Sequence, residues 1–272
     1  MTDVKAKLRL RLALCLIPIL FLLASMNLRA QQQTVRVAAA ADLKFAMGEL
    51  ASQFENATGI RVDITTGSSG NFFAQIQNGA PFDLFFSADM GYPRRLEAES
   101  FTEPGTLCEY ALGRIVIWAP ASTEIDVAKQ GWNVLLDSRV QKIAIANPLL
   151  APYGRAAVSA LQKAGLYDQV KNKLVYGENI SQATQFVQSG NAQAGIIAYS
   201  LALSSGMKEG KLWKIPAEMY PPIEQGAVVL KAAKNKNAAL GFLTFVRSST
   251  GKTILEKYGF DEPVDEERRK SQ

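Results

Sequence analysis

Histidine is absent from all 272 residues of the sequence. Without an imidazole, the chain cannot form the Ser-His or Cys-His pairs of nucleophilic enzymes or the usual histidine-containing metal sites. Cysteine is almost absent as well, with Cys15 in an apolar leader and Cys108 alone in the remainder. A chain that loses its leader therefore has no partner for Cys108 and no intrachain disulfide, so packing has to hold the fold.

The leader, residues 1–30, differs in composition from the rest of the chain. Four Lys and Arg residues precede an uncharged apolar run over 12–28, which contains Pro18 and is followed by Ala30. This order is typical of a secretory signal peptide and predicts a periplasmic protein. A membrane anchor is the alternative, but the run is short for a membrane span and a proline interrupts it.

Basic charge is also scarce once the leader is removed. The formal net charge falls from +5 to +1, because residues 1–30 contain five Lys or Arg and one Asp. A protein that binds nucleic acid keeps a basic face in its mature form. We therefore expect no nucleic-acid partner, and we expect the exported chain to be a monomer.

Strand and helix patterns alternate along the mature chain. Strands are predicted at 35–41, 60–67, 82–89, 114–120, 142–148, 193–200 and 226–230, separated by helical stretches that include 43–58, 153–163 and 237–246. Such alternation predicts an α/β fold with mostly parallel sheets. The charged tail from Asp261 onward has no apolar period, so we expect a frayed end there.

Four strand-to-helix junctions are rich in small and hydroxyl residues. They lie at 38–43, 65–70, 147–154 and 177–183. In open α/β sheets, helix N-termini at the carboxyl ends of strands present free backbone N–H groups that favour an anion.

The junction "TTGSSG", residues 65–70, has the most hydrogen-bond donors. Ser68 and Ser69 can donate hydroxyl and amide hydrogens, while Gly67 and Gly70 allow the backbone to approach a ligand closely. The alternative is that these serines only cap their own helix.

Two other motifs are compatible with an enzyme. Asp83 and Asp89 in "FDLFFSAD" could form a carboxylate acid and base pair, but no nucleophile with a base accompanies them. We interpret them as residues that cap or link elements. The segment "STGKT", residues 249–253, resembles the end of a phosphate-binding P-loop, but Val246 stands where that motif requires glycine. We interpret this segment as a helix start.

Five segments together resemble one protein family. In chain order they are "AAAADLKFAM", "TTGSSGNFFAQIQNGAPFDLFFSAD", "NPLLAPYGRAA", "GENISQA" and "KYGF". With these segments the chain resembles the molybdate-binding proteins of bacterial ABC importers, within the type II periplasmic binding-protein superfamily. The resemblance covers nearly all of the mature sequence, and "GAPFDLFFSAD" is its most distinctive part.

The resemblance implies two α/β lobes with mixed, mostly parallel sheets, joined by two crossover strands. The crossovers are expected near 115–119 and 225–229. Residues 31–116 plus 228–262 are then the first lobe, 117–227 the second lobe and 263–272 a flexible tail.

The resemblance also implies an oxyanion held by neutral donors. Ser69 matches the family's hydroxyl ligand, and Tyr153 and Ile180 match positions that supply backbone amides. At the first junction, where the family usually has Ser, Thr or Asn, this chain has Ala41 and Asp42. Because a carboxylate repels a dianion, we expect Asp42 to cap its own helix and turn aside, leaving the amides of Ala41 or Asp42 as donors.

The implied function is capture of molybdate, and of tungstate, between the lobes and delivery to the membrane permease of an ABC importer. No catalysis, cofactor or direct cation ligand is expected. Ser68 and Tyr199 are weaker candidates for the site. A carrier for sulfate, phosphate or an organic anion is the alternative, because sulfate shares the charge and tetrahedral shape of molybdate. The sequence does not set the size of the site or separate molybdate from tungstate.

Overall fold

The computed structural model of the chain describes residues 33–263. The predicted signal peptide and nearly all of the predicted flexible tail lie outside these residues. Within the described part, no helix has the length and apolar composition that a membrane crossing requires.

The first of two sheets has five strands in the order β2-β1-β3-β10-β4. Their bounds are β1 Thr34–Ala40, β2 Arg61–Gly67, β3 Leu84–Ser87, β4 Cys108–Gly113 and β10 Ile223–Val229. Strand β1 pairs in parallel with β2 and β3, whereas β10 pairs antiparallel with both β3 and β4. One strand, β10, therefore runs against the other four.

The second sheet repeats this topology with strands in the order β7-β6-β8-β5-β9. Their bounds are β5 Ile115–Pro120, β6 Ile143–Ala146, β7 Leu174–Gly177, β8 Ala194–Ala198 and β9 Gly210–Lys214. Here β6 pairs in parallel with β7 and β8, and β5 pairs antiparallel with β8 and β9. The prediction of an α/β fold with mixed, mostly parallel sheets is confirmed.

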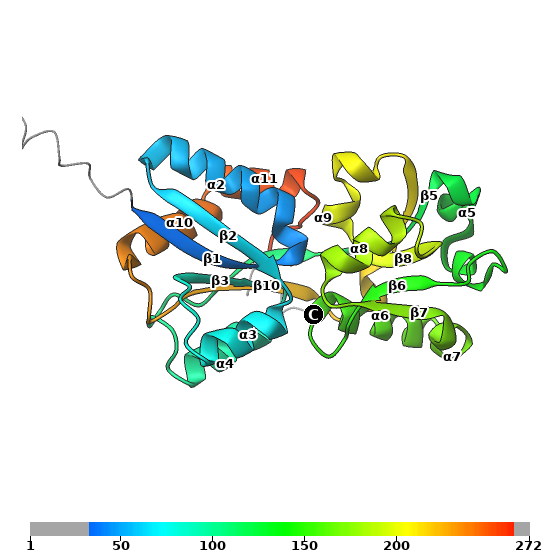
Figure 1. Cartoon of the computed structure of the whole chain (residues 1–272), viewed down its shortest axis with the longest axis horizontal. Helices are drawn as coiled ribbons and strands as arrows, with labels where there is room; N and C mark the ends of the chain where they lie inside the picture. The colour runs from blue at the N-terminus through cyan, green and yellow to red at the C-terminus, as the bar shows by residue number, and fades with distance from the viewer. Residues whose placement is uncertain (1–32, 264–272) are drawn as a thin grey trace, which may run out of the picture. The chain divides into compact units, whose positions relative to one another are not determined.

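Helices cover both faces of the first sheet. They are α2 Lys44–Thr58, α3 Ser69–Gln77, α4 Gly91–Ala98, α10 Lys236–Arg247 and α11 Ser249–Lys257. Figure 1 shows α2, α10 and α11 on one face and α3 and α4 on the other. Alternate residues of β1 serve the two faces, since Val37 and Ala39 pack with α2 and α10 while Ala38 packs with Phe72 of α3. This alternation follows from the two-residue period of a strand.

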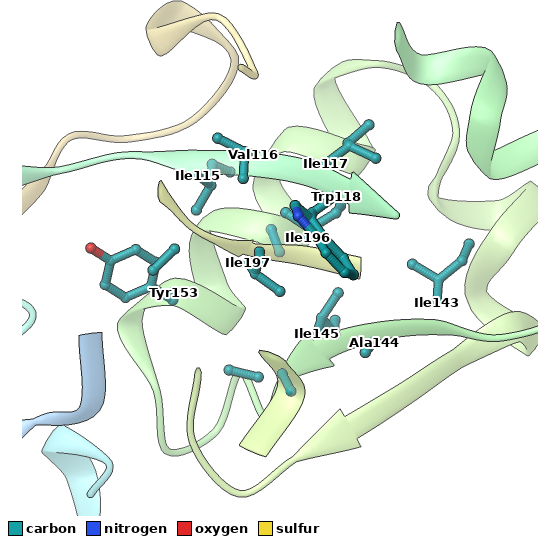
Figure 2. Packing of buried hydrophobic residues seen from close by; sticks show 14 of the residues in the cluster. Ile115, Val116, Ile117, Trp118, Ile143, Ala144, Ile145, Tyr153, Ile196 and Ile197 are labelled. Atoms are coloured by element: carbon teal, nitrogen blue, oxygen red, sulfur yellow. The ribbon is translucent and has the colours of Figure 1, made fainter. Parts of the chain in front are cut away.

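The second sheet is covered in the same way. Its helices are α5 Val127–Gln130, α6 Pro152–Lys163, α7 Tyr167–Val170, α8 Ile180–Gln188 and α9 Tyr199–Ala202. Helices α6 and α8 lie on opposite faces (Figure 1). The core of this sheet includes many β-branched residues, such as Ile145, Ile196 and Ile197 (Figure 2). Ala41 and Ala88, which follow strands of the first sheet, belong to the same cluster of buried residues.

In helix α2, the sequence pattern predicts both the buried face and the end of the helix. Ala46, Met47, Leu50 and Phe54 are buried, as their helical spacing predicts. The helix ends at Gly59, whose φ of 72° lies in the left-handed region that glycine adopts without strain. The "STGKT" segment is also a helix start, as predicted, because Ser248 caps α11 by accepting a hydrogen bond from the amide of Gly251.

Three strands were not predicted from the sequence: β4, β7 and β9. Each lies at the edge of its sheet, and the burial of its residues is irregular. The two predicted lobe boundaries fall inside β5 and β10, although each of these strands pairs within a single sheet. The division into lobes stays a prediction.

The prediction of a frayed end from Asp261 onward was wrong at its first residue. Asp261 forms a β-bridge with Leu112 and an ion pair with Arg114. Backbone pairing with β4 and a charge partner fix this residue, and neither is visible in the local sequence.

Asp83 links three segments of the first sheet and is fully buried. Its carboxylate accepts hydrogen bonds of 2.7 Å from the amides of Arg36, before the middle of β1, and of Lys234, beyond β10. The Arg36 side chain lies 3.6 Å from the same carboxylate. The interpretation of Asp83 as a linking residue is therefore confirmed.

We predict that Asp83→Ala lowers the free energy of unfolding by about 3 kcal/mol, because it leaves two amides without their acceptor in a buried site. The matched control is Asp63→Ala, which removes an exposed ion pair with Arg61 and is expected to cost less than about 1 kcal/mol. Urea unfolding of both variants measures the difference. Equal losses would show that the Asp83 carboxylate does not link these segments energetically.

Candidate functional site

The two serines that begin α3 have different roles. Ser68 is the N-cap, and its hydroxyl oxygen accepts a hydrogen bond from the amide of Asn71 at 3.3 Å. Ser69 is the first helical residue and is 1% exposed, and its hydroxyl oxygen accepts from the amide of Ala88 at 3.0 Å. A hydroxyl that accepts one hydrogen bond keeps its own hydrogen for donation. The cap-only interpretation thus describes Ser68 and leaves Ser69 able to donate.

Helix α6 begins with a proline and a buried tyrosine. Pro152 is the first helical residue, so Tyr153 stands second, where a backbone N–H has no acceptor within its own helix. The next residue, Gly154, lies against β6: a Cβ atom there would be 2.2 Å from the carbonyl oxygen of Ala146. Glycine is required because only the absence of a side chain lets this turn pack on the strand.

Helix α8 begins in a similar way. The side chain of Asn179 caps it by accepting a hydrogen bond of 3.0 Å from the amide of Gln182. Ile180 follows as the first helical residue, and its apolar side chain is buried. Its backbone N–H stands among the four at a helix start that have no intrahelical acceptor. The site residue here is therefore defined by its backbone and not by its side chain.

The junction after β1 differs from expectation. Ala41 and Asp42 lie in a single 3-10 turn, η1 Ala41–Leu43, and no side chain caps it. The expectation that Asp42 caps its own helix was therefore wrong. The Asp42 side chain is instead 1% exposed, and the Asp42 carbonyl oxygen accepts a hydrogen bond of 2.8 Å from the hydroxyl of Ser200.

The carboxyl group of Asp42 lies in a polar cluster with no cation. Within the described residues, neither of its oxygens has a hydrogen-bond partner. Burial raises the pKa of Asp42 to about 7, and the nearby Tyr153 hydroxyl and Gln225 amide oppose this rise only in part. Gln225 is fully buried and connects Tyr153, at 3.4 Å, to the hydroxyl of Tyr110, at 3.1 Å. Figure 2 shows the Tyr153 hydroxyl directed away from Ile145 and Ile197.

Direct contacts bring the four junctions together. The amide of Gly70 in α3 donates to the carbonyl oxygen of Leu150, just before α6, at 2.9 Å. The side chain of Asn71 donates to Glu178, just before α8, at 2.6 Å. The turn η1 packs against α8. The starts of α3, α6 and α8 and the turn after β1 thus surround one region.

The remaining predicted residue, Tyr199, lies apart from these contacts. It begins α9, its amide donates to the carbonyl oxygen of Arg114, and its ring lies 4.2 Å from the Lys214 ammonium. The structure adds no support for Tyr199 as a ligand. Ser200 and Gln225 were not predicted from the sequence, because a lone Ser or Gln in a strand or short helix gives no signal before its tertiary partners are known.

The arrangement offers neutral hydrogen-bond donors. Free amides at the starts of α6 and α8, together with the Ser69 hydroxyl, favour a compact anion. Within residues 33–263, no group of three or more Cys, Asp or Glu side chains is placed to hold a metal ion. Asp89 acts structurally, since it accepts from the amide of Tyr92 at the start of α4 and pairs with Arg155.

Comparison with known proteins agrees with this geometry. The family model described as "Bacterial extracellular solute-binding protein" matches residues 35–261. The molybdate-binding protein ModA of Azotobacter vinelandii is 41% identical over 236 residues, which cover 85% of this chain and 91% of that protein. ModA of Rhodobacter capsulatus is 36% identical, covering 89% and 93%. The structure of the Azotobacter vinelandii periplasmic molybdate-binding protein superposes with a TM-score of 0.78 at 34% identity, covering 85% of this chain and all of that one.

The raised pKa of Asp42 predicts an unusual dependence of stability on pH. The pKa is about 7 in the fold against an ordinary value of 3.8, so the folded chain binds this proton more tightly than the unfolded chain. The contribution is fully present below about pH 4 and is lost as the pH rises through 7, by at most about 1.4 kcal/mol per pH unit. Asn does not titrate, so Asp42→Asn is expected to gain stability relative to the wild type between pH 4 and 7. Urea unfolding of both proteins across this range measures the difference, and a constant difference would contradict a buried, titrating Asp42.

Proposed function

Because this chain belongs to the bacterial extracellular solute-binding protein family, we propose that it captures molybdate outside the cytoplasm and delivers it to an ABC importer. It is a binding protein of a transport system and not an enzyme. The observation that carries the choice of ligand is the convergence of neutral donors from α3, α6 and α8, in a chain 41% identical to a molybdate-binding protein. Tungstate, which has nearly the same size, is the second ligand that we propose.

The proposed ligand set contains no charged donor. The Ser69 hydroxyl and the backbone amides of Tyr153, Ile180 and the Ala41–Asp42 turn surround the anion. Roughly five charge-assisted hydrogen bonds at ~1.5–3 kcal/mol each give ~8–15 kcal/mol. Closure of the site and the loss of ligand freedom oppose this gain. A net ~8 kcal/mol corresponds to a Kd of about 1 μM or tighter.

The cellular arrangement is part of the same proposal. Residues 1–30 act as a signal peptide, and the mature monomer carries the anion through the periplasm to its membrane permease. Residues 31–116 plus 228–262 form one lobe and 117–227 the other, and the ligand lies between them. Support comes from the basic and apolar leader and from the two sheets of equal topology.

A titration series with four oxyanions tests the ligand. We predict that the mature chain binds molybdate and tungstate with Kd values within about tenfold of each other, near ~1 μM or below. Sulfate and phosphate are expected to bind more weakly, because a site sized for the larger molybdate leaves some donors too far from the smaller anions. Isothermal titration calorimetry measures all four. Sulfate or phosphate binding as tight as molybdate binding would overturn the proposed ligand.

The adjacent serines of α3 provide a matched pair of variants. Ser69→Ala removes a donor to the anion and is expected to weaken molybdate binding by about 10- to 150-fold. Ser68→Ala removes only the helix cap, so it is expected to cost ~1 kcal/mol of stability with little change in affinity. Calorimetry and urea unfolding separate the two effects. Unchanged affinity in Ser69→Ala would show that the Ser69 hydroxyl does not bind the anion.

A further inference from the structure

A buried polar cluster connects Asp42 to the start of α6. It consists of Asp42 in η1, Tyr153 in α6, Gln225 in β10 and Tyr110 in β4, each at most 4% exposed. The side chain of Gln225 donates to the Tyr153 hydroxyl and accepts from the Tyr110 hydroxyl. Strands β4 and β10 and the turn η1 belong to or follow the first sheet, whereas α6 covers the second. The cluster therefore joins the two halves of the described structure.

The surroundings of Asp42 favour a neutral carboxylic acid. An unpaired carboxylate in a buried site is costly, and such a group commonly becomes neutral instead. Its polar neighbours are the Tyr153 hydroxyl, the Gln225 amide and the backbone N–H groups of Asp42 and Leu43, and none of these is a cation. On α9, Ser200 contacts the Asp42 carbonyl oxygen; on α2, Lys44 is exposed and lies over the Phe45 ring. The first turn of α8, which packs against η1, carries no charged side chain over Ile180–Gln182.

Tyr153 connects this cluster to the anion. Its hydroxyl lies in the cluster, while its backbone N–H stands at the second position of α6, where it has no intrahelical acceptor. A side chain held at its hydroxyl end limits the rotation and displacement of the first turn of α6. Gln225, which donates to the Tyr153 hydroxyl, therefore also helps to fix one of the amides proposed to bind the anion.

We propose that Asp42 is a positioning residue that works as a neutral acid: it lies beside Tyr153, whose hydroxyl Gln225 holds, and leaves the first turn of α6 in the anion-binding position only when it is uncharged, so that the anion binds only with Asp42 protonated. This inference rests on the proposed function and adds that anion binding requires a proton on Asp42. A dianion nearby repels a carboxylate, so the bound state excludes the ionised form more strongly than the free state does.

The coupling between the Asp42 proton and the anion makes the affinity fall as the pH rises. Asp42 has a pKa of about 7, so the free protein releases the proton above neutral pH and must take it up again to bind. Affinity is then constant in acid and falls by about tenfold for each pH unit well above 7. The pKa values of Tyr110 and Tyr153 are raised well above 10, mainly by burial, so both hydroxyls stay neutral. Burial also raises the pKa of the nearby Cys108 thiol.

The test measures molybdate affinity between about pH 6 and pH 9, where molybdate stays a dianion. We expect the wild-type affinity to fall by about 30- to 100-fold over this range. Asp42→Asn is expected to show less than about a threefold change, because an amide of the same shape does not titrate. Ser69→Ala is the control: its affinity is lower throughout but keeps the wild-type slope, because the Asp42 proton is still there.

Proton uptake gives a second measurement that does not depend on a variant. Calorimetry of wild-type binding near pH 8 in two buffers of different ionisation enthalpy is expected to report uptake of about one proton. Molybdate binding that is independent of pH and takes up no proton would overturn the role of Asp42 and leave the proposed function intact. Absence of molybdate binding at every pH would instead overturn the proposed function itself.

Discussion

The proposed site depends on backbone amides that have no partner in their own helices. The first turn of every helix leaves such amides free, and a fold that points several of them at one place needs no charged side chain to attract an anion. Here the contact between Gly70 and the Leu150 carbonyl oxygen brings the start of α3 against the segment before α6. Residues 31–272 carry a formal net charge of only +1, which is consistent with this kind of recognition.

Sheet topology is what makes these helix starts meet. Both sheets have the same strand order, with one antiparallel strand next to the third parallel one. The helices that follow β2, β6 and β7 all begin at the carboxyl ends of parallel strands, the usual ligand side of an α/β sheet. Residues that suggested chemistry in the sequence have structural roles, because Asp83 links strands and Asp89 receives the amide at the start of α4.

The role of the Asp42 side chain could not be predicted from a short motif. Its position after an apolar strand identified it as part of the first junction, but its expected role as a helix cap was wrong. The partners that decide its behaviour are Tyr153 and Gln225, far away in sequence. The same holds for the edge strands β4, β7 and β9, whose pairing depends on neighbouring strands more than on their own hydrophobic pattern.

The sequence by itself determined the fold class, the central strands of both sheets and the four junctions, because hydrophobic period and turn residues act over a few neighbouring positions. It also placed Ser69, Tyr153 and Ile180 at helix starts, where free amides are a local property of the chain. Only the tertiary structure decided that Ser68 caps while Ser69 remains able to donate, and that Asp42 is buried beside Tyr153 without a cation. Burial and long-range hydrogen bonds arise between segments more than a hundred residues apart, so no local pattern can encode them.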